Sequence, residues 1–133
     1  MEFSNSSLSW TLGNALCSSF LDFFILDSEL KPIYYTSGAS SYLPSFLPKN
    51  DEKGLVVVSE IEKKKTFISY LKTRLDKKSF GSIEQKIIDS TQKQFLIKMP
   101  LEMTEDYLNL LVSKIKDGNI LVLINIEKRK KSI

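Results

Sequence analysis

The sequence predicts an α+β fold built on a five-stranded antiparallel sheet, and two observations near the C-terminus carry the prediction. First, Asp117-Gly118 separates two apolar runs of strand length, and Asp-Gly favours a tight hairpin because both residues accept positive φ angles. Second, both runs are apolar on two faces, which is typical of strands near the centre of a sheet. The hairpin from Asp106 to Glu127 is therefore expected to organise the fold.

Composition indicates one ordinary globular domain. A chain of 133 residues is long enough for a single core, and 42% hydrophobic with 26% charged residues is the usual balance for such a core. The lone Cys17 excludes an internal disulfide framework, and no apolar run is long enough for a signal peptide or a membrane span. We therefore expect a cytoplasmic protein with no membrane partner.

The charge is unevenly distributed along the chain. The formal net charge is only +3, yet all 19 basic residues follow position 30. They include Lys63–Lys65, Arg74, Lys77, Lys78 and the run Lys128–Lys131, without aromatic or base-reading residues interleaved among them. We interpret them as solvated helix surfaces and a tail, and nucleic-acid binding by this domain is not expected.

Residues 4–20 are predicted to form an amphipathic helix. Leu8, Leu12 and Leu16 follow at helical spacing, and Phe20 widens the stripe. Trp10 lies off this stripe, so it is free to meet a second surface. We assign residues 1–19 as an N-terminal helix, 20–127 as the domain, and 128–133 as a basic tail or the start of a linker to an output segment.

Two short strands are expected next, at Phe23–Asp27 and Pro32–Thr36. Asp27 and Ser28 suit the turn between them because their side chains can bond the backbone ahead. Pro32 lacks a backbone donor, which places the second strand at a sheet edge. Residues 37–54 are rich in Ser, Pro and Gly and predict short helical turns, whereas Leu55–Val58 suits a strand or the start of a helix.

A long helix is predicted over residues 60–78. Ser59 and Glu62 form a capping-box pattern at its start, and Lys77 and Lys78 are expected at its C-terminus, where cations favour the helix dipole. Its buried stripe comprises Ile61, Phe67, Ile68, Leu71 and Leu75. Ser82 and Gln85 repeat the capping pattern, so residues 82–92 favour a short second helix over a strand.

The clearest alternation in the chain predicts a strand from Phe95 to Met103. Its apolar positions are Phe95, Ile97, Met99, Leu101 and Met103. Pro100 cannot donate to a ladder, so this strand belongs at a sheet edge or a bulge. We interpret the stripe as core; lining a pocket is the alternative. Numbering the five strands in chain order, the two edges give a sheet ordered 2-1-5-4-3, with helices on one face.

Three stretches resemble the PAS domain, a widespread signal-sensing module. Phe24–Tyr35 is similar to the opening hairpin of the family, and Lys116-Asp-Gly-Asn-Ile120 is similar to the turn into its last strand. Asn125-Ile-Glu-Lys-Arg-Lys-Lys131 resembles the closing D-I-T-E-R-K-K signature. Ile126, Arg129, Lys130 and Lys131 match that signature, while Asn125 replaces the Asp, Glu127 the Thr and Lys128 the Glu. The resemblance spans about residues 20 to 131.

The resemblance implies a sensory or dimerisation module of signal transduction or transcription regulation, but the cofactor-binding branches of the family fit poorly. The chain has no histidine, which excludes a histidine-ligated haem, and it lacks the reactive cysteine of the flavin branch. No cofactor is identified, no catalytic or metal-ligating residue is predicted, and no cofactor-binding residue is assigned. A small organic ligand in a cavity between the sheet and the middle helices is one alternative, and a module without any ligand is the other.

Three functional hypotheses follow. The first is the PAS-like module, dimerising through the N-terminal helix and connected to a C-terminal output domain in a longer chain. The second is a profilin- or longin-like protein-interaction module without a ligand, and a long, broken helical crossover between the second and third strands favours the first over it. The third is a small enzyme that uses carboxylates without His or Cys catalysis. It is not expected, because the sequence has neither a glycine-rich phosphate loop nor a histidine to activate a nucleophile, and no carboxylate pair stands out.

Overall fold

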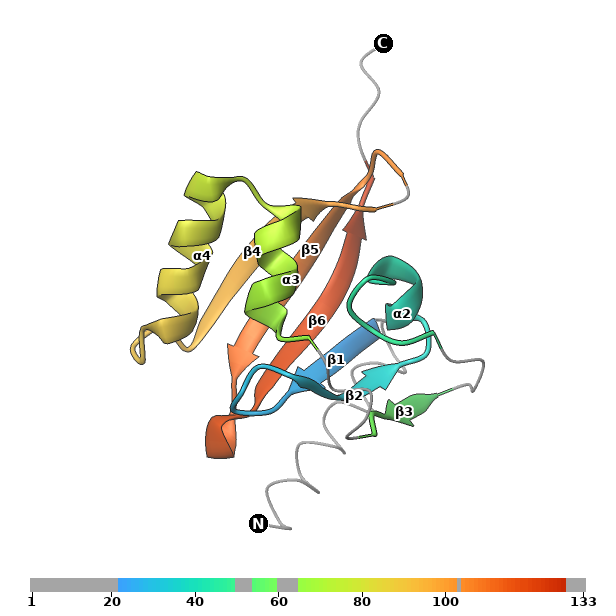
Figure 1. The fold of residues 1–133 in the computed structure, drawn as a ribbon, viewed down its shortest axis with the longest axis horizontal. Helices are drawn as coiled ribbons and strands as arrows, with labels where there is room; N and C mark the ends of the chain where they lie inside the picture. Colours follow the sequence, from blue (N-terminus) through green and yellow to red (C-terminus); the bar gives the residue numbers. More distant parts are fainter. Residues whose placement is uncertain (1–21, 50–53, 60–64, 103, 129–133) are drawn as a thin grey trace.

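The computed structural model describes residues 22–49, 54–59, 65–102 and 104–128, and the fold is α+β. In chain order the elements are β1 (Asp22–Leu26), β2 (Pro32–Thr36), α2 (Ala39–Tyr42), β3 (Leu55–Val57), α3 (Phe67–Arg74), α4 (Lys77–Ile88), β4 (Gln94–Pro100), β5 (Tyr107–Lys114), the 3₁₀ turn η2 (Lys116–Gly118) and β6 (Ile120–Glu127). The labelled helices lie together on one side of the sheet (Figure 1). The predicted N-terminal helix and the last residues of the tail fall outside the described residues.

The sheet has six antiparallel strands in the order β3-β2-β1-β6-β5-β4, so the prediction of five strands is wrong. The added strand is β3, which pairs with β2 through Tyr35 and Val56. The second strand is consequently not at an edge. Pro32 is tolerated there because it occupies the first position of β2, beside an irregularity in the pairing with β1.

The predicted hairpin is confirmed as a pair of eight-residue strands, β5 and β6, joined by a tight turn. Asp117 and Gly118 have φ angles of 63° and 77°, the positive values expected of them. The Asn119 backbone N–H donates to the Lys116 carbonyl at 3.3 Å and closes the turn. As predicted, β1 and β6 are the two central strands of the sheet.

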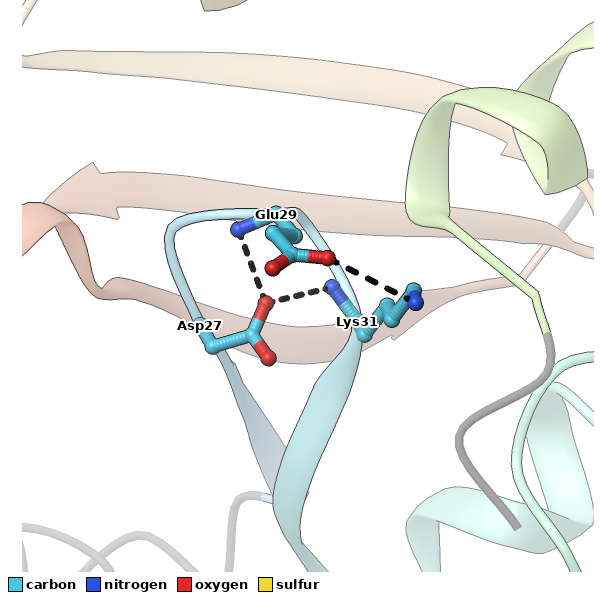
Figure 2. A network of polar contacts seen from close by, with 3 residues as sticks. All are labelled: Asp27, Glu29 and Lys31. Carbon is cyan, nitrogen blue, oxygen red and sulfur yellow. Dashed lines mark hydrogen bonds and ion pairs between the residues drawn. The ribbon is translucent and has the colours of Figure 1, made fainter. Parts of the chain in front are cut away.

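The turn between β1 and β2 is held by Asp27. Its Oδ1 accepts hydrogen bonds from the backbone N–H groups of Glu29 at 2.9 Å and Lys31 at 3.0 Å (Figure 2). Across the turn, Lys31 Nζ lies 3.5 Å from a Glu29 carboxylate oxygen. These bonds support Leu30 at a φ of 66°, and they confirm the predicted role of the Asp27 side chain.

The helical region differs from the prediction of one long helix over 60–78. Within the described residues α3 begins after Thr66, whose hydroxyl accepts from the Ser69 N–H, and Ser59 is not its cap. The chain then breaks at Asp76, which caps a new helix by accepting from the Ser79 N–H at 2.8 Å. Lys77 and Lys78 therefore start α4 rather than end α3. Residues 77–88 are helical, so the short helix favoured within 82–92 is confirmed as far as Ile88, although its cap is Asp76 and not Ser82.

The edge strand β4 closes the sheet at the end opposite β3, as Pro100 predicted. Phe95, Ile97 and Met99 are buried and the residues between them are exposed, so the stripe is core. The strand ends at Pro100, earlier than expected, and Met103 lies outside the described residues. Leu101 instead donates its N–H to the Asp106 carbonyl and begins the link to β5.

Candidate ligand-binding region between the sheet and the helices

The cavity predicted between the sheet and the middle helices is filled by aromatic side chains. Phe24 from β1 meets Phe46 and Phe67 in edge-to-face contacts, with ring centroids 5.7 and 5.6 Å apart. Phe46 also packs against Tyr70 at 5.2 Å. Rings at these distances are in direct contact. The layer beneath α2 and α3 is therefore a close-packed core rather than a ligand chamber.

A cluster of polar side chains adjoins this aromatic layer at Tyr70. We define this polar cluster as Ser45, Lys65, Tyr70, Arg74 and Glu102. The Glu102 carboxylate accepts from the Ser45 hydroxyl and, at 3.4 Å, from the Tyr70 hydroxyl. Lys65 Nζ donates to the Ser45 carbonyl at 3.2 Å. The cluster thus joins the turn after α2, the start of α3 and the segment that follows β4.

Arg74 links the polar cluster to the edge strand β4. Its guanidinium donates to the Pro100 carbonyl at 2.7 Å, which attaches the end of α3 to the end of β4. Its Nε is buried and has no hydrogen-bond partner among the described residues. A guanidinium held in this way fixes the spacing between helix and edge strand more firmly than a flexible lysine would.

The electrostatics of the polar cluster do not favour catalysis. Burial raises the pKa of the Tyr70 hydroxyl far above its ordinary value, and the neighbouring Glu102 carboxylate raises it further. Tyr70 is therefore neutral near pH 7 and acts as a hydrogen-bond donor rather than as a base. The Ser45 hydroxyl donates directly to the Glu102 carboxylate with no imidazole between them, so this serine lacks the base that usually activates a nucleophilic hydroxyl.

An open depression lies beside this region, where α4 passes over β4. Its volume is about 300 Å³, and its apolar lining comes from Leu75, Ile83 and Ile97. Ser79, Ser82 and Lys78 contribute the polar groups, and Lys98 completes the lining. Lys98 forms an ion pair with Glu127 at 2.6 Å and lies over the Tyr107 ring, so its ammonium group is already engaged. The depression can take a small, mostly apolar molecule on a partly open surface.

Neither a metal site nor a membrane helix emerges from the residues that the structure describes. No group of three or more Cys, Asp or Glu side chains is placed to hold a metal ion within those ranges. In the same residues no helix is long and apolar enough to cross a membrane.

No binding residue was predicted from the sequence. The Ser45–Glu102 contact has no sequence signal, because the two residues are 57 positions apart.

Comparisons with known proteins leave the family open. The chain matches no protein-family model, and no curated protein shows significant sequence similarity to it.

Proposed function

We propose that this chain is a PAS-like sensory or dimerisation module of signal transduction or transcription regulation, and that it has no catalytic activity of its own. The observation that carries the proposal is the crossover from β2 to β4. After β2 the chain passes through α2, adds β3 beside β2, and continues through α3 and α4 to return as β4, the edge strand at the other end of the sheet. This long, broken helical crossover is the feature that favours the PAS-like module over a profilin- or longin-like one.

The proposed ligand is a small organic molecule in the depression between α4 and β4. The aromatic layer under α2 and α3 leaves no comparable space, because its four rings are in contact with one another. A mostly apolar floor with the Ser82 hydroxyl and the Lys78 side chain at the rim suits a compact molecule with a single polar end. In the absence of a ligand, the same module works by self-association alone.

Native mass spectrometry of the purified chain tests both parts of the proposal. We expect a homodimer and, where a ligand is retained, an added mass that disappears in Ser82→Trp, because the new ring fills the depression. Gln85→Trp is the matched control, since Gln85 is exposed on the same helix but does not line the depression. A monomer without added mass would contradict the proposal.

A further inference from the structure

The face of the sheet opposite α2, α3 and α4 carries two apolar rows that cross the strands. Phe24 faces the helices, where it contacts Phe46 and Phe67, and strand alternation therefore turns Phe23 and Ile25 to the other side. The pairing register extends each of them into a row. The first row consists of Leu96, Leu111, Leu123 and Phe23, and the second of Leu121, Ile25, Tyr34 and Val57.

Each row is buried at the end that lies on a central strand and exposed at the end that lies on an edge strand. Phe23 on β1 and Leu121 on β6 are each only 6% exposed, although no helix among the described residues lies on their side. By contrast, Leu96 on β4 is 64% exposed and Val57 on β3 is 67% exposed. A large apolar side chain in the middle of an uncovered sheet face would be far more accessible than 6%. The pattern indicates a cover over β1 and β6 that is narrower than the whole sheet.

The chain before β1 has the length and the pattern to be that cover. It joins the sheet at Asp22, the first residue of a central strand, so it starts directly beside the covered part of the face. Residues 4–20 as a helix would be about 25 Å long, which matches the length of an eight-residue strand such as β6, about 27 Å. The stripe Leu8, Leu12, Leu16 and Phe20 supplies one apolar side and no charge.

We infer that residues 4–20 pack as a helix across β1 and β6 on the face opposite α2–α4, with the leucine stripe against the two apolar rows of their own chain. This inference rests on the burial and the pairing of the sheet residues, and it does not depend on the proposed sensory function. It makes the fold a three-layer arrangement of helices, sheet and N-terminal helix. The uncovered ends of the rows, at Leu96 and at Tyr34 and Val57, remain as apolar surface on either side of the helix.

Cross-linking in the full-length chain tests this placement. Cys17 is the only cysteine in the chain. In a Cys17→Ser background, one cysteine introduced on the helix and one on the sheet therefore define a single pair. Ser9→Cys lies beside the leucine stripe, and Ser113→Cys lies on the same face of the sheet as Leu121, with which it pairs. The matched control combines Ser9→Cys with Ser69→Cys, which is exposed on α3 on the opposite side. All changes exchange only sulfur and oxygen.

We expect a short bis-maleimide to join Ser9→Cys to Ser113→Cys within one chain, at a yield at least tenfold above that of the control pair. A product of twice the chain mass would assign the cover to the helix of a second copy and overturn the inference. Equal yields for the two pairs, or no product with either, would also overturn it. As an independent measurement, Leu12→Asn with Leu16→Asn should lower the thermal midpoint clearly more than the off-stripe change Thr11→Asn, and equal midpoints would contradict the placement.

Discussion

Single carboxylates mark where helix α4 begins and ends. Asp76 separates α3 from α4, and its pKa is lowered because the carboxylate accepts hydrogen bonds from the Ser79 backbone N–H and hydroxyl. Asp89 ends α4 in a comparable way, with its pKa lowered by the N–H and hydroxyl of Thr91. For both groups, the ionised carboxylate is therefore more favourable in the folded protein than in the unfolded chain.

Asp76 is expected to make folding sensitive to acid. Because its folded pKa is depressed, its contribution to stability is complete above the unfolded pKa of about 3.9 and is lost as the pH falls through the folded pKa. Asp76→Ala should lower the thermal midpoint at pH 7 and reduce its decline on acidification. Asp76→Asn is the control, since asparagine retains the cap but does not titrate. Parallel pH profiles for all three proteins, measured by circular dichroism melts, would contradict this assignment.

The aromatic layer makes a second prediction at the scale of the residue. Phe46 is 6% exposed and touches three other rings, so Phe46→Ala removes these contacts and leaves a cavity. We expect a loss of about 3–5 kcal/mol in the free energy of unfolding, measured by urea denaturation. Phe80→Ala, at a partly buried position on α4, should cost clearly less. If the two losses were equal, the layer under α2 and α3 would not be the centre of the core.

At the scale of the element, sequence patterns predicted those parts whose signal is local. The Asp117-Gly118 turn and the alternation of Phe95, Ile97 and Met99 each need only a few adjacent residues, and the structure confirms both. The start of α3 was not predicted, because the Ser59–Glu62 capping-box pattern lies upstream, whereas the Thr66 hydroxyl caps the helix by accepting from the Ser69 N–H. Strand β3 has only three residues, which is too short for a period to separate strand from helix.

The break between α3 and α4 has a local signal in the sequence. Asp76-Lys77-Lys78-Ser79 places a capping carboxylate three residues before a serine whose N–H it bonds. The apolar stripe of the expected long helix ends at Leu75, directly before this point, and Lys77 and Lys78 suited the last turn of that helix. Lys114 provides an interaction that no periodicity could show, because its Nζ reaches from β5 to the C-terminal carbonyls of Lys86 and Asp89.

The edge strand β4 carries a prediction of its own. The Leu101 N–H bonds the Asp106 carbonyl and the Lys114 N–H bonds the Lys93 carbonyl, so alternation turns the backbone nitrogen of Pro100 toward the open edge. Pro100→Val should leave folding intact but restore an outward donor, which promotes edge-to-edge association. Sedimentation at increasing concentration would detect the association, with Pro44→Val, at an exposed turn position, as the control. Unfolding without association would show that Pro100 instead fixes the end of the strand.

At the scale of the whole molecule, the sheet has more apolar surface than the described helices cover. On the side where α2, α3 and α4 are attached to the strands, the aromatic layer and the polar cluster cover the surface of the sheet. The two apolar rows lie on the other side, and the burial of Phe23 and Leu121 on the central strands requires another element there. The sequence predicted this requirement from strands that are apolar on both faces, but it could not predict the rows, because they depend on pairing between residues up to 100 positions apart.

The last prediction follows from removing the N-terminal segment. Without residues 1–19, both apolar rows face solvent, and a contiguous apolar surface of this kind drives association. We expect the truncated chain to aggregate, as measured by sedimentation, and to lose the proposed homodimer. Trp10→Ala should leave the cover in place and weaken only the dimer, because Trp10 lies off the leucine stripe; burying a tryptophan is worth a few kcal/mol at about 25 cal/mol per Å².

Ser7→Ala is the control for Trp10→Ala, since it changes the same segment without removing apolar area. A soluble, folded truncation that still dimerises would contradict both roles of the segment. A wild-type monomer that aggregates only after truncation would retain the segment as a cover and remove its role in dimerisation. The two proposed roles are therefore separable, because helical spacing would put the stripe and Trp10 on different sides of the inferred helix, and each side can be altered while the other is kept.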